Sequence, residues 1–196
     1  MAAATTTSYW TDASLEPKRN FRWRVTIPSL QSGQTVIWWV KNFKPPSYDI
    51  SETTHSIMDN KFNFPGRLTW TDCSMTMVDP VSTNAVQMTN DIIIQAGYST
   101  KSIQTFGAKP TTMSKRKSVS ATGNVLVEVL NSDGNAIEKW TLHNPWIKAA
   151  SFSELSYESD DLRTIDITWK YDWAECENFD HDGNDVGVNP QFEPKV

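Results

Sequence analysis

The residue types that could do chemistry in this 196-residue chain are few and scattered. The three histidines, His55, His143 and His181, have no second His or Cys at metal-ligand spacing. The two cysteines, Cys73 and Cys176, lie far apart without a CxxC pair, so neither a disulfide framework nor a zinc site is expected. Hydrolase, nucleotide-binding and zincin motifs are missing from the sequence. We therefore expect no enzyme and no cofactor.

One short segment, "DHDGND" at residues 180–185, superficially resembles a calcium-binding loop. Its side-chain oxygens alternate at Asp180, Asp182 and Asn184. A calcium loop has glycine at the sixth position and glutamate at the twelfth, whereas here glycine is fourth and Gln191 stands twelfth. An acidic, flexible C-terminal extension is the preferred interpretation.

The nine tryptophans could form stacking platforms for sugars or bases. Trp23, Trp169 and Trp173 fall on the apolar sides of alternating patterns, which predicts that they belong to the core. A carbohydrate-binding β-sandwich nevertheless remains an alternative. It would use the tryptophans outside those patterns, such as Trp10, Trp38 or Trp146.

The formal net charge of −5 is unevenly spread. Residues 98–122 hold five basic residues and no acid, and residues 172–196 hold seven acids against one lysine. Such blocks usually mark solvated loops and tails, although a basic loop could also meet the acidic tail of a neighbouring subunit. No run of residues has the length and apolarity to cross a bilayer, so we expect no membrane partner.

Alternating apolar and polar residues predict most of the secondary structure as strands. Residues 21–27 and 165–173 alternate cleanly, and residues 125–143 form two strands around an Asp-Gly turn. Residues 36–40 are apolar on both faces, so both faces of that strand must be covered. With the strand from residue 62 onwards, the total is about six or seven strands.

Two features of residues 61–97 predict how that segment changes direction. The apolar positions change parity between Trp70 and Cys73, which indicates a β-bulge near Asp72. Pro80 then begins a helix that ends at Gly97, with apolar residues at helical spacing between them. We expect this to be the only substantial helix, because residues 99–123 and 145–161 read as irregular connections.

Residues 44–60 are polar and open with two prolines. Their lack of a regular pattern predicts a long, protruding connection between the two strands of a hairpin. Long connections of this kind often bind something, although a flexible surface loop is the open alternative.

Three stretches together resemble the tail tube proteins of contractile-tailed, myovirus-type bacteriophages. They are "FPGRLTWTDCSMTMVDP", "TNDIIIQAG" and "PWIKAASFSELSYESDDLRTIDITWKYDWAE". The first is similar to that family's hairpin return strand with its glycine, Gly66. The last is similar to its closing strands, which finish at Trp173 to Glu175. The resemblance covers residues 20–175.

The resemblance implies one mainly β domain over residues 1–196, with a core at about 20–175 and an acidic extension at 176–196. The fold would be a β-sandwich or barrel of about six or seven strands with one flanking α-helix and a long protruding hairpin. Hexameric rings would stack into the inner tail tube of a virion assembled in the host bacterial cytoplasm. The partners would be the sheath, the baseplate, the tape measure protein and DNA in transit. The extended tail and basic loop leave a baseplate or tail-end protein of the same fold as an alternative.

Within this interpretation three sets of residues are candidate assembly sites. The contact between stacked rings is expected from Lys44, Pro45, Pro46, Tyr48, Asp49, His55, Met58 and Asn60. The lining of the channel should be polar and weakly acidic, since clusters of free cations would hold DNA phosphates; the candidates are Glu128, Lys139, Thr141, Asp166, Thr168, Lys170 and Asp172. Contacts with other subunits or the sheath are expected from Met88, Asn90, Lys101, Lys115, Arg116 and Lys117.

Overall fold

A computed structural model describes residues 17–28, 39–81, 85–98, 112–158 and 160–180. Several sequence predictions fall outside these ranges. They are the two-faced segment from Val36 to Trp38, the basic residue Lys101, the calcium-like segment after Asp180 and the sugar-stacking candidate Trp10.

Two four-stranded antiparallel sheets form the body of the protein. Sheet A has the order β1-β6-β7-β10, with β1 at Trp23–Thr26, β6 at Val125–Leu130, β7 at Ala136–His143 and β10 at Trp173–Asn178. Its hydrogen-bonded register places Val25 opposite Val127, and Val127 opposite Trp140.

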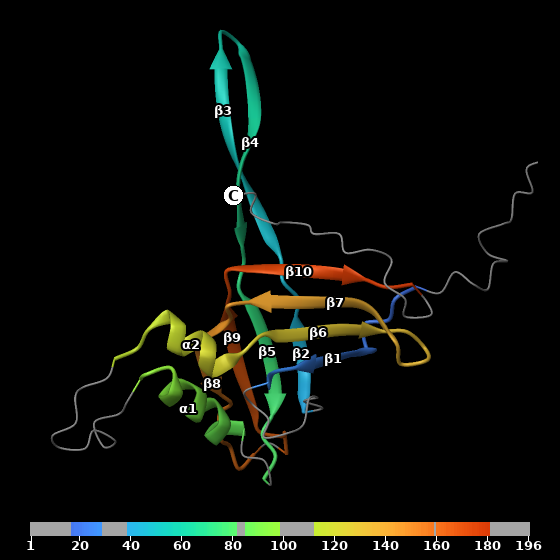
Figure 1. Ribbon diagram of the computed structural model, residues 1–196, viewed down its shortest axis with the longest axis vertical. Coiled ribbons are helices and arrows are strands. Elements are labelled where there is room, and N and C mark those ends of the chain that lie inside the picture. The colour runs from blue at the N-terminus through green and yellow to red at the C-terminus, as the bar shows by residue number, and fades with distance from the viewer. Residues whose placement is uncertain (1–16, 29–38, 82–84, 99–111, 159, 181–196) are drawn as a thin grey trace, which may run out of the picture.

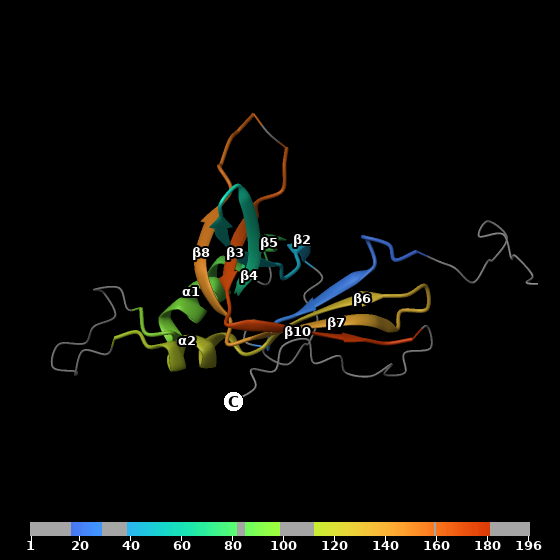
Figure 2. The same cartoon turned by 90° about the horizontal axis from the view of Figure 1, so that it is seen from above.

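Sheet B has the order β2-β5-β9-β8. Its strands are β2 (Val40–Lys44), β5 (Cys73–Val78), β9 (Thr164–Lys170) and β8 (Trp146–Phe152). The strands of sheet A run across those of sheet B, as Figure 1 shows, and Figure 2 shows the two sheets as separate layers. The arrangement is that of an orthogonally packed β-sandwich.

One hydrophobic core fills the space between the sheets. Sheet B contributes Ile165, Ile167 and Trp169, and sheet A contributes Val125 and Leu142, all fully buried. These residues occupy every second position of their strands, as expected of a sheet with one buried face. The mainly β fold predicted from the sequence is confirmed.

A third, two-stranded sheet projects from the body as an arm, defined by residues 48–70. It consists of β3 (Tyr48–Ile57) and β4 (Asn60–Trp70), joined at Met58 and Asp59. Figure 1 shows it extending far beyond the two sheets. The protruding hairpin was predicted, but the irregular structure expected for residues 44–60 was wrong. All ten residues of β3 are exposed, so no alternation of burial marked the strand in the sequence.

The β-bulge predicted near Asp72 is absent from that position, and the register irregularity lies within the arm. The chain does not bulge at Asp72: β4 ends at Trp70 and β5 begins at Cys73, so the parity changes because the chain passes from one sheet to another. The irregularity lies instead between Ile50 and Glu52, where one residue, Ser51, faces Gly66 and Arg67. Ser51 Oγ accepts a hydrogen bond of 2.9 Å from the Arg67 amide.

The helical predictions need two further corrections. Helix α1 covers Ala85–Gln95, later than expected, and the Asp79 carboxylate accepts a hydrogen bond of 3.0 Å from the Ala85 amide. A second helix, α2 at Lys115–Thr122, lies in the segment expected to be irregular, with Ser114 as its N-cap. The described part of the chain therefore has two helices instead of one, and both pack beside sheet B in Figure 2. No helix in the described residues is long and apolar enough to span a membrane.

The C-terminal strands also differ from the sequence prediction. Strand β8 lies in the supposed connection at residues 145–161, and the long strand ending at Trp173 is divided into β9 and β10. Ten strands are present in the described residues, against the six or seven expected. β10 extends to Asn178, with Cys176 buried, so ordered structure continues past Glu175.

Candidate assembly surfaces

The tip of the arm has an apolar face, and the register shift between Ile50 and Glu52 separates it from the base of the arm. Beyond the irregularity at Ser51, the register places Thr53 opposite Phe64 and His55 opposite Phe62. Alternation along the strands therefore puts Phe62, Phe64 and Ile57 on one face of the tip. Their exposed fractions are 50%, 55% and 52%. A face of large, half-exposed apolar side chains on a free-standing hairpin indicates a binding surface.

The base of the arm is fixed to the body by aromatic and charged side chains. Tyr48 and Trp70 make an edge-to-face contact with ring centroids 5.5 Å apart, and Trp70 lies 5.9 Å from Tyr171 of the core. Directly after the arm, Asp72 accepts hydrogen bonds from Lys148 at 2.5 Å and Lys170 at 2.8 Å. These bonds, that from Lys148 most strongly, lower the pKa of Asp72.

The ring-stacking residues predicted from the sequence fall into three environments. Lys44 belongs to β2 and Pro46 is buried, so Pro46 is unavailable to another molecule. The others are exposed. They are Pro45 next to the body, Tyr48, Asp49 and His55 on β3, and Met58 and Asn60 at the tip.

The outer face of sheet A carries a row of alternating charges across all four strands. The register aligns Arg24, Glu128, Lys139 and Glu177. Arg24 Nε donates to Glu128, which raises the Arg24 pKa, and Lys139 donates to Glu177 at 2.7 Å. The described strands of sheet A therefore contain no lysine or arginine without a carboxylate partner.

The next positions on the same face are mixed in character, because Leu126 and Trp173 lie there beside polar residues. The prediction that Trp173 belongs to the core was therefore wrong, since Ala174 takes the buried position. Thr141 faces Glu175, and His143 lies 3.1 Å from the Glu175 carboxylate while stacking on Trp173. The structure thus brings the predicted channel residues Glu128, Lys139 and Thr141 together on one face. Sequence reasoning missed Arg24, whose polar parity was the available signal, and Glu177, which lies beyond the predicted strand.

The other predicted channel residues do not belong to this surface. Asp166, Thr168 and Lys170 lie on the outer face of sheet B, where Asp166 accepts a 2.5 Å hydrogen bond from Thr76. Asp172 lies at the corner where β9 passes into β10.

Asp172 stabilises that corner through hydrogen bonds and does not belong to the outer face of sheet A. Its carboxylate accepts hydrogen bonds from Lys115 of α2 at 2.6 Å and from Asn144 at 2.8 Å, and its amide donates to the His143 carbonyl. Burial alone would raise the pKa of Asp172, but the two donors outweigh it and the pKa is lowered. Asp172 therefore holds α2 against the sheets.

The predicted subunit or sheath contacts lie on the two helices. Met88 of α1 packs against the core, whereas Asn90 is exposed. In α2, Lys115, Arg116 and Lys117 are exposed. Lys117 Nζ donates to the Thr112 carbonyl, in addition to the Lys115 contact with Asp172.

Sheet A has two edges available for pairing. Among the described strands, β1 and β10 each have a hydrogen-bonded neighbour on one side only. The edge strand β8 of sheet B, in contrast, lies against α2. Unpaired edges are templates for pairing with another chain, unless a protein protects them.

The potentially reactive residues that the structure describes take no part in a shared site. No group of three or more His, Cys, Asp or Glu residues in the described ranges could hold a metal ion. Both cysteines are buried, and burial raises the pKa of Cys73 to about 12 and that of Cys176 to about 11. Trp146, the described candidate for sugar stacking, is half-buried.

No protein-family model and no curated protein matches the chain. Solved structures do match it. A chain in the cryo-EM structure of the anti-feeding prophage baseplate superposes with a TM-score of 0.59 at 10% identity, covering 82% of this chain and 95% of that chain. A chain in the PVC sheath-tube complex, an extracellular contractile injection system, gives a TM-score of 0.55 at 17% identity, with coverages of 88% and 99%.

This protein has the fold of contractile injection system components. A further match, in the PVC sheath/tube terminator, has a TM-score of 0.55 at 13% identity and covers 82% of this chain and 96% of that one. The resemblance to tube proteins is therefore confirmed at the level of the fold.

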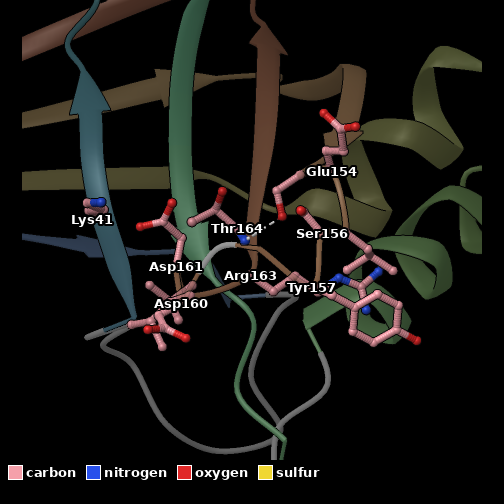
Figure 3. Close-up of a pocket in the computed structure, with 12 residues that line it drawn as sticks. Lys41, Glu154, Ser156, Tyr157, Asp160, Asp161, Arg163 and Thr164 are labelled. Atoms are coloured by element: carbon pink, nitrogen blue, oxygen red, sulfur yellow. Dashed lines mark hydrogen bonds between the residues drawn. The ribbon is translucent and has the colours of Figure 1, made fainter.

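Sequence reasoning missed one further surface, a hollow at the end of sheet B opposite the arm. Its lining comes from the connection between β8 and β9, with Lys41 and Val78 beside it (Figure 3). The connection exposes Leu155, Tyr157 and Leu162 almost fully. Those apolar residues stand among the acids of residues 154–162, and this was the signal available before the structure.

Proposed function

We propose that this chain is a structural subunit of the inner tube of a contractile tail. Subunits would form rings, most simply hexameric, that stack into a hollow conduit inside the sheath. The observation that carries the proposal is sheet A, whose edge strands β1 and β10 have one partner each among the described strands and flank an outer face of mutually paired charges. The shared fold supports it.

Edge pairing gives the ring its physical basis. Strand β10 of one subunit and β1 of the next would extend sheet A from subunit to subunit. Such a contact is heterologous, because different surfaces of the two copies meet, and it closes into a ring when the rotation between copies closes. A closed ring leaves neither edge of sheet A free, which removes the aggregation hazard of β1 and β10.

The outer face of sheet A is the lining we propose for the channel. Affinity for DNA comes mainly from lysine and arginine at phosphates, which release counterions on binding. Here Arg24 and Lys139 are held by Glu128 and Glu177, and Glu175 adds a further carboxylate. Such a surface is polar and weakly acidic, so DNA would pass without being retained.

The remaining surfaces are assigned to assembly. We place the arm, with Tyr48, Asp49, His55, Met58 and Asn60, at the contact between stacked rings. The exposed residues of α1 and α2 would face the sheath or a neighbouring subunit. Before ejection the channel would hold the tape measure protein, and the whole would be a component of the virion tail. A structural role accounts for these surfaces without catalysis.

A second candidate function is a baseplate or tail-end protein that starts or caps the tube. The superposition on a chain of the anti-feeding prophage baseplate favours it. The two roles differ in self-assembly, because a repeating subunit adds to its own kind without limit, whereas an initiator stops at one ring.

Sedimentation velocity and negative-stain electron microscopy of the purified chain, over a range of concentrations, test the proposal. A tube subunit gives uniform rings and hollow filaments that lengthen with concentration. Single rings at every concentration would favour the baseplate role. A monomer at every concentration and salt would contradict both.

A further inference from the structure

The two edges of sheet A carry opposite charge. Figure 1 shows β1 and β10 as the outer strands of this sheet. Residues 17–28, which include β1, hold four basic side chains and no acid, and residues 173–180, which include β10, hold three acids and no base. The basic residues are Lys18, Arg19, Arg22 and Arg24, and the acids are Glu175, Glu177 and Asp180.

A ring brings these two edges together as an antiparallel pair. All neighbouring strands of sheet A are antiparallel, so β1 and β7 run in one direction and β6 and β10 in the other. A rotation about an axis along the strands preserves these directions. Strand β10 of one copy therefore meets β1 of the next copy running the opposite way.

The backbone of β1 has groups available at alternate residues. The Leu130 amide donates a hydrogen bond of 2.9 Å to the Arg22 carbonyl. Successive residues of an antiparallel strand direct their amide and carbonyl groups to opposite sides, so Arg22 and Arg24 direct theirs to β6. The groups of Trp23 and Val25 are therefore directed to the open edge.

The backbone of β10 has the same alternation. The Phe179 amide donates a hydrogen bond of 3.0 Å to the Ile137 carbonyl, so Glu177 and Glu175 direct their backbone groups to β7. The groups of Cys176, between them, are directed to the open edge. At both edges, the residues with available backbone groups alternate with the charged residues of the outer face.

Pairing of these edges places the charged side chains directly opposite one another. The available backbone groups of the two strands bond to each other, so the charged residues occupy the non-hydrogen-bonded pairs between them. In such pairs the Cα atoms are about 4.5 Å apart and the side chains are closest. Opposite charges at these positions stabilise strand pairing, and like charges destabilise it.

Charge distinguishes one register from those that the alternation allows. In this register Glu175 lies opposite Arg24 of the next copy. Glu177 then lies opposite Arg22, so both carboxylates face guanidinium groups. A shift of two residues brings Glu177 opposite Arg24 but leaves Glu175 opposite Thr26. A shift of two residues the other way leaves Glu177 without an arginine.

Closure of a sheet favours the same register. A closed sheet requires a stagger between its strands. Within one copy, Arg24 and Glu177 belong to the same row across the four strands. If Glu177 faced Arg24 of the next copy, that row would close on itself without a stagger. With Glu175 opposite Arg24, the row advances by two residues at each subunit boundary.

The partners within the chain are compatible with this contact. The Glu175 carboxylate lies 3.1 Å from His143, which is charged only when protonated, so Arg24 of the next copy would supply a permanent cation. Arg24 has Glu128 on its other side, and the five N–H donors of a guanidinium can hold two carboxylates. The side chains of Arg24 and Glu175 are 41% and 44% exposed, so both are accessible to a neighbour.

We propose that Glu175 and Glu177 of one copy lie opposite Arg24 and Arg22 of the next copy and fix the register of the ring contact. The inference rests on the proposed tube function and names the residues that select the partner edge. The contact is heterologous, because an acidic edge meets a basic one. Two β10 edges, or two β1 edges, would repel each other.

Disulfide formation between the two edges tests the register. Arg24→Cys and Glu175→Cys are combined in one chain, and the assembled rings are oxidised mildly. Directly opposed positions lie within the Cα separation that a disulfide bridges. We expect a ladder of covalent multimers on a non-reducing denaturing gel, ending at the size of the ring. Within one chain the two positions are three interstrand spacings apart, about 14 Å, so no internal disulfide competes.

The matched control is the slipped pair, Arg24→Cys with Glu177→Cys. In the proposed register these positions are diagonal neighbours about 7–8 Å apart, too far for a disulfide. A ladder from this pair and none from the first would overturn the register. A further pair, Arg22→Cys with Glu177→Cys, should yield the same ladder as the first, and it keeps Arg24 and Glu128 intact.

The native thiols do not obscure the result. Cys73 and Cys176 are buried, and burial raises their pKa values to about 12 and about 11. Almost no thiolate is therefore present at neutral pH. The unmodified chain, oxidised in the same way, should give no ladder.

Charge exchange gives an independent readout. Glu175→Lys places a lysine opposite Arg24 of the next copy, and Arg24→Glu places a glutamate opposite Glu175. Each variant alone should need an about tenfold higher concentration to form rings. In an equal mixture the introduced lysine meets the introduced glutamate, so assembly should recover. The matched control is Asp166→Lys, which makes the same change of charge on the outer face of sheet B and should assemble as the unmodified chain does.

The outcomes separate this inference from the proposed function. Rings that form while only the slipped pair cross-links would overturn the register and leave the tube function standing. A mixture of the two charge variants that fails to recover would overturn the selection by charge. Rings without a ladder from any pair would overturn the edge contact itself, and an unmodified chain that never assembles would overturn the tube function as well.

Discussion

The arm and strand β5 follow one another in the chain and are both extended, but their side chains differ in burial. In β5, Cys73, Met75 and Met77 are at most 3% exposed, because the body of the same chain covers them. In β3 every residue is exposed, and the register gives it no neighbour except β4. An isolated two-stranded hairpin is marginally stable in water. The side chains of β5 are therefore covered within one chain, whereas the arm leaves exposed the surface that we propose for the contact with another subunit.

This contrast predicts that core and arm substitutions damage different properties. Trp169→Ala should destabilise the folded chain by about 3–5 kcal/mol, because Trp169 is fully buried between the sheets. Phe62→Ala on the arm should change unfolding by no more than about 0.5 kcal/mol. Urea denaturation of the unassembled chain measures both. Equal losses of stability would mean that the arm packs on its own body.

A substitution at Gly66 should disrupt the register irregularity of the arm and leave the packing of the core unchanged. A Cβ added at Gly66 would lie 2.3 Å from Ser51 Oγ and 2.8 Å from the Ser51 carbonyl oxygen. Gly66→Ala should therefore cost about 1–3 kcal/mol, confined to the arm. Hydrogen exchange should accelerate at arm amides and stay unchanged in β5 and β9. The matched control is Gly134→Ala, because no atom lies within 4 Å of a Cβ there, although its φ of 83° adds some strain.

The junction between the two regions should depend on pH. Lys148 and Lys170 lower the pKa of Asp72, so the folded state favours its carboxylate. This stabilisation is fully present above the ordinary pKa of aspartate and is lost as the pH falls through the lowered value. Asp72→Asn should cost about 0.5–1 kcal/mol near pH 7. The difference from the unmodified chain should vanish in strong acid; a difference independent of pH would contradict the ion-pair explanation.

The smallest effect on stability is expected on the outer face of sheet A. Glu128→Gln removes the carboxylate that holds Arg24 and should change the free energy of unfolding by less than about 1 kcal/mol. Its consequence should be functional, since Arg24 without Glu128 can bind phosphate. Assembled tubes of this variant should retain short DNA at low salt in a pelleting assay.

Asp166→Asn is the matched control for that measurement, because it removes an acid from the outer face of sheet B. It should leave DNA retention unchanged. If it increases retention as much as Glu128→Gln does, the face of sheet A has no special relation to the channel.

The sequence predicted those parts of the fold in which burial alternates along a strand. Val25, Val127 and Ile167 were placed on buried faces from their spacing alone, and each is buried. The patterns failed where an element is exposed on all sides. Strand β3 has no buried face, and helix α2 buries only Ala121 and Thr122 at its end, so neither produced a periodic signal.

Positions where the chain changes sheets were also beyond sequence reasoning. From Ile165 to Trp173 the apolar residues alternate without a break, which predicted one strand. The structure has two strands, β9 and β10, with a corner at Asp172. The Asp172 carboxylate accepts hydrogen bonds from Lys115 and Asn144 at that corner. For the candidate channel face, polarity identified Glu128, Lys139 and Thr141. Glu177, the ion-pair partner of Lys139, could not be assigned, because the pairing depends on the register between β7 and β10.

A cryo-EM reconstruction of the purified chain at high concentration tests the central claim most directly. The account predicts closed rings, in which β10 of one copy pairs with β1 of the next and Glu128, Lys139 and Thr141 face the hole. A solitary molecule at every concentration, or a ring whose hole is lined by Asp166 and Thr168 of sheet B, would contradict it.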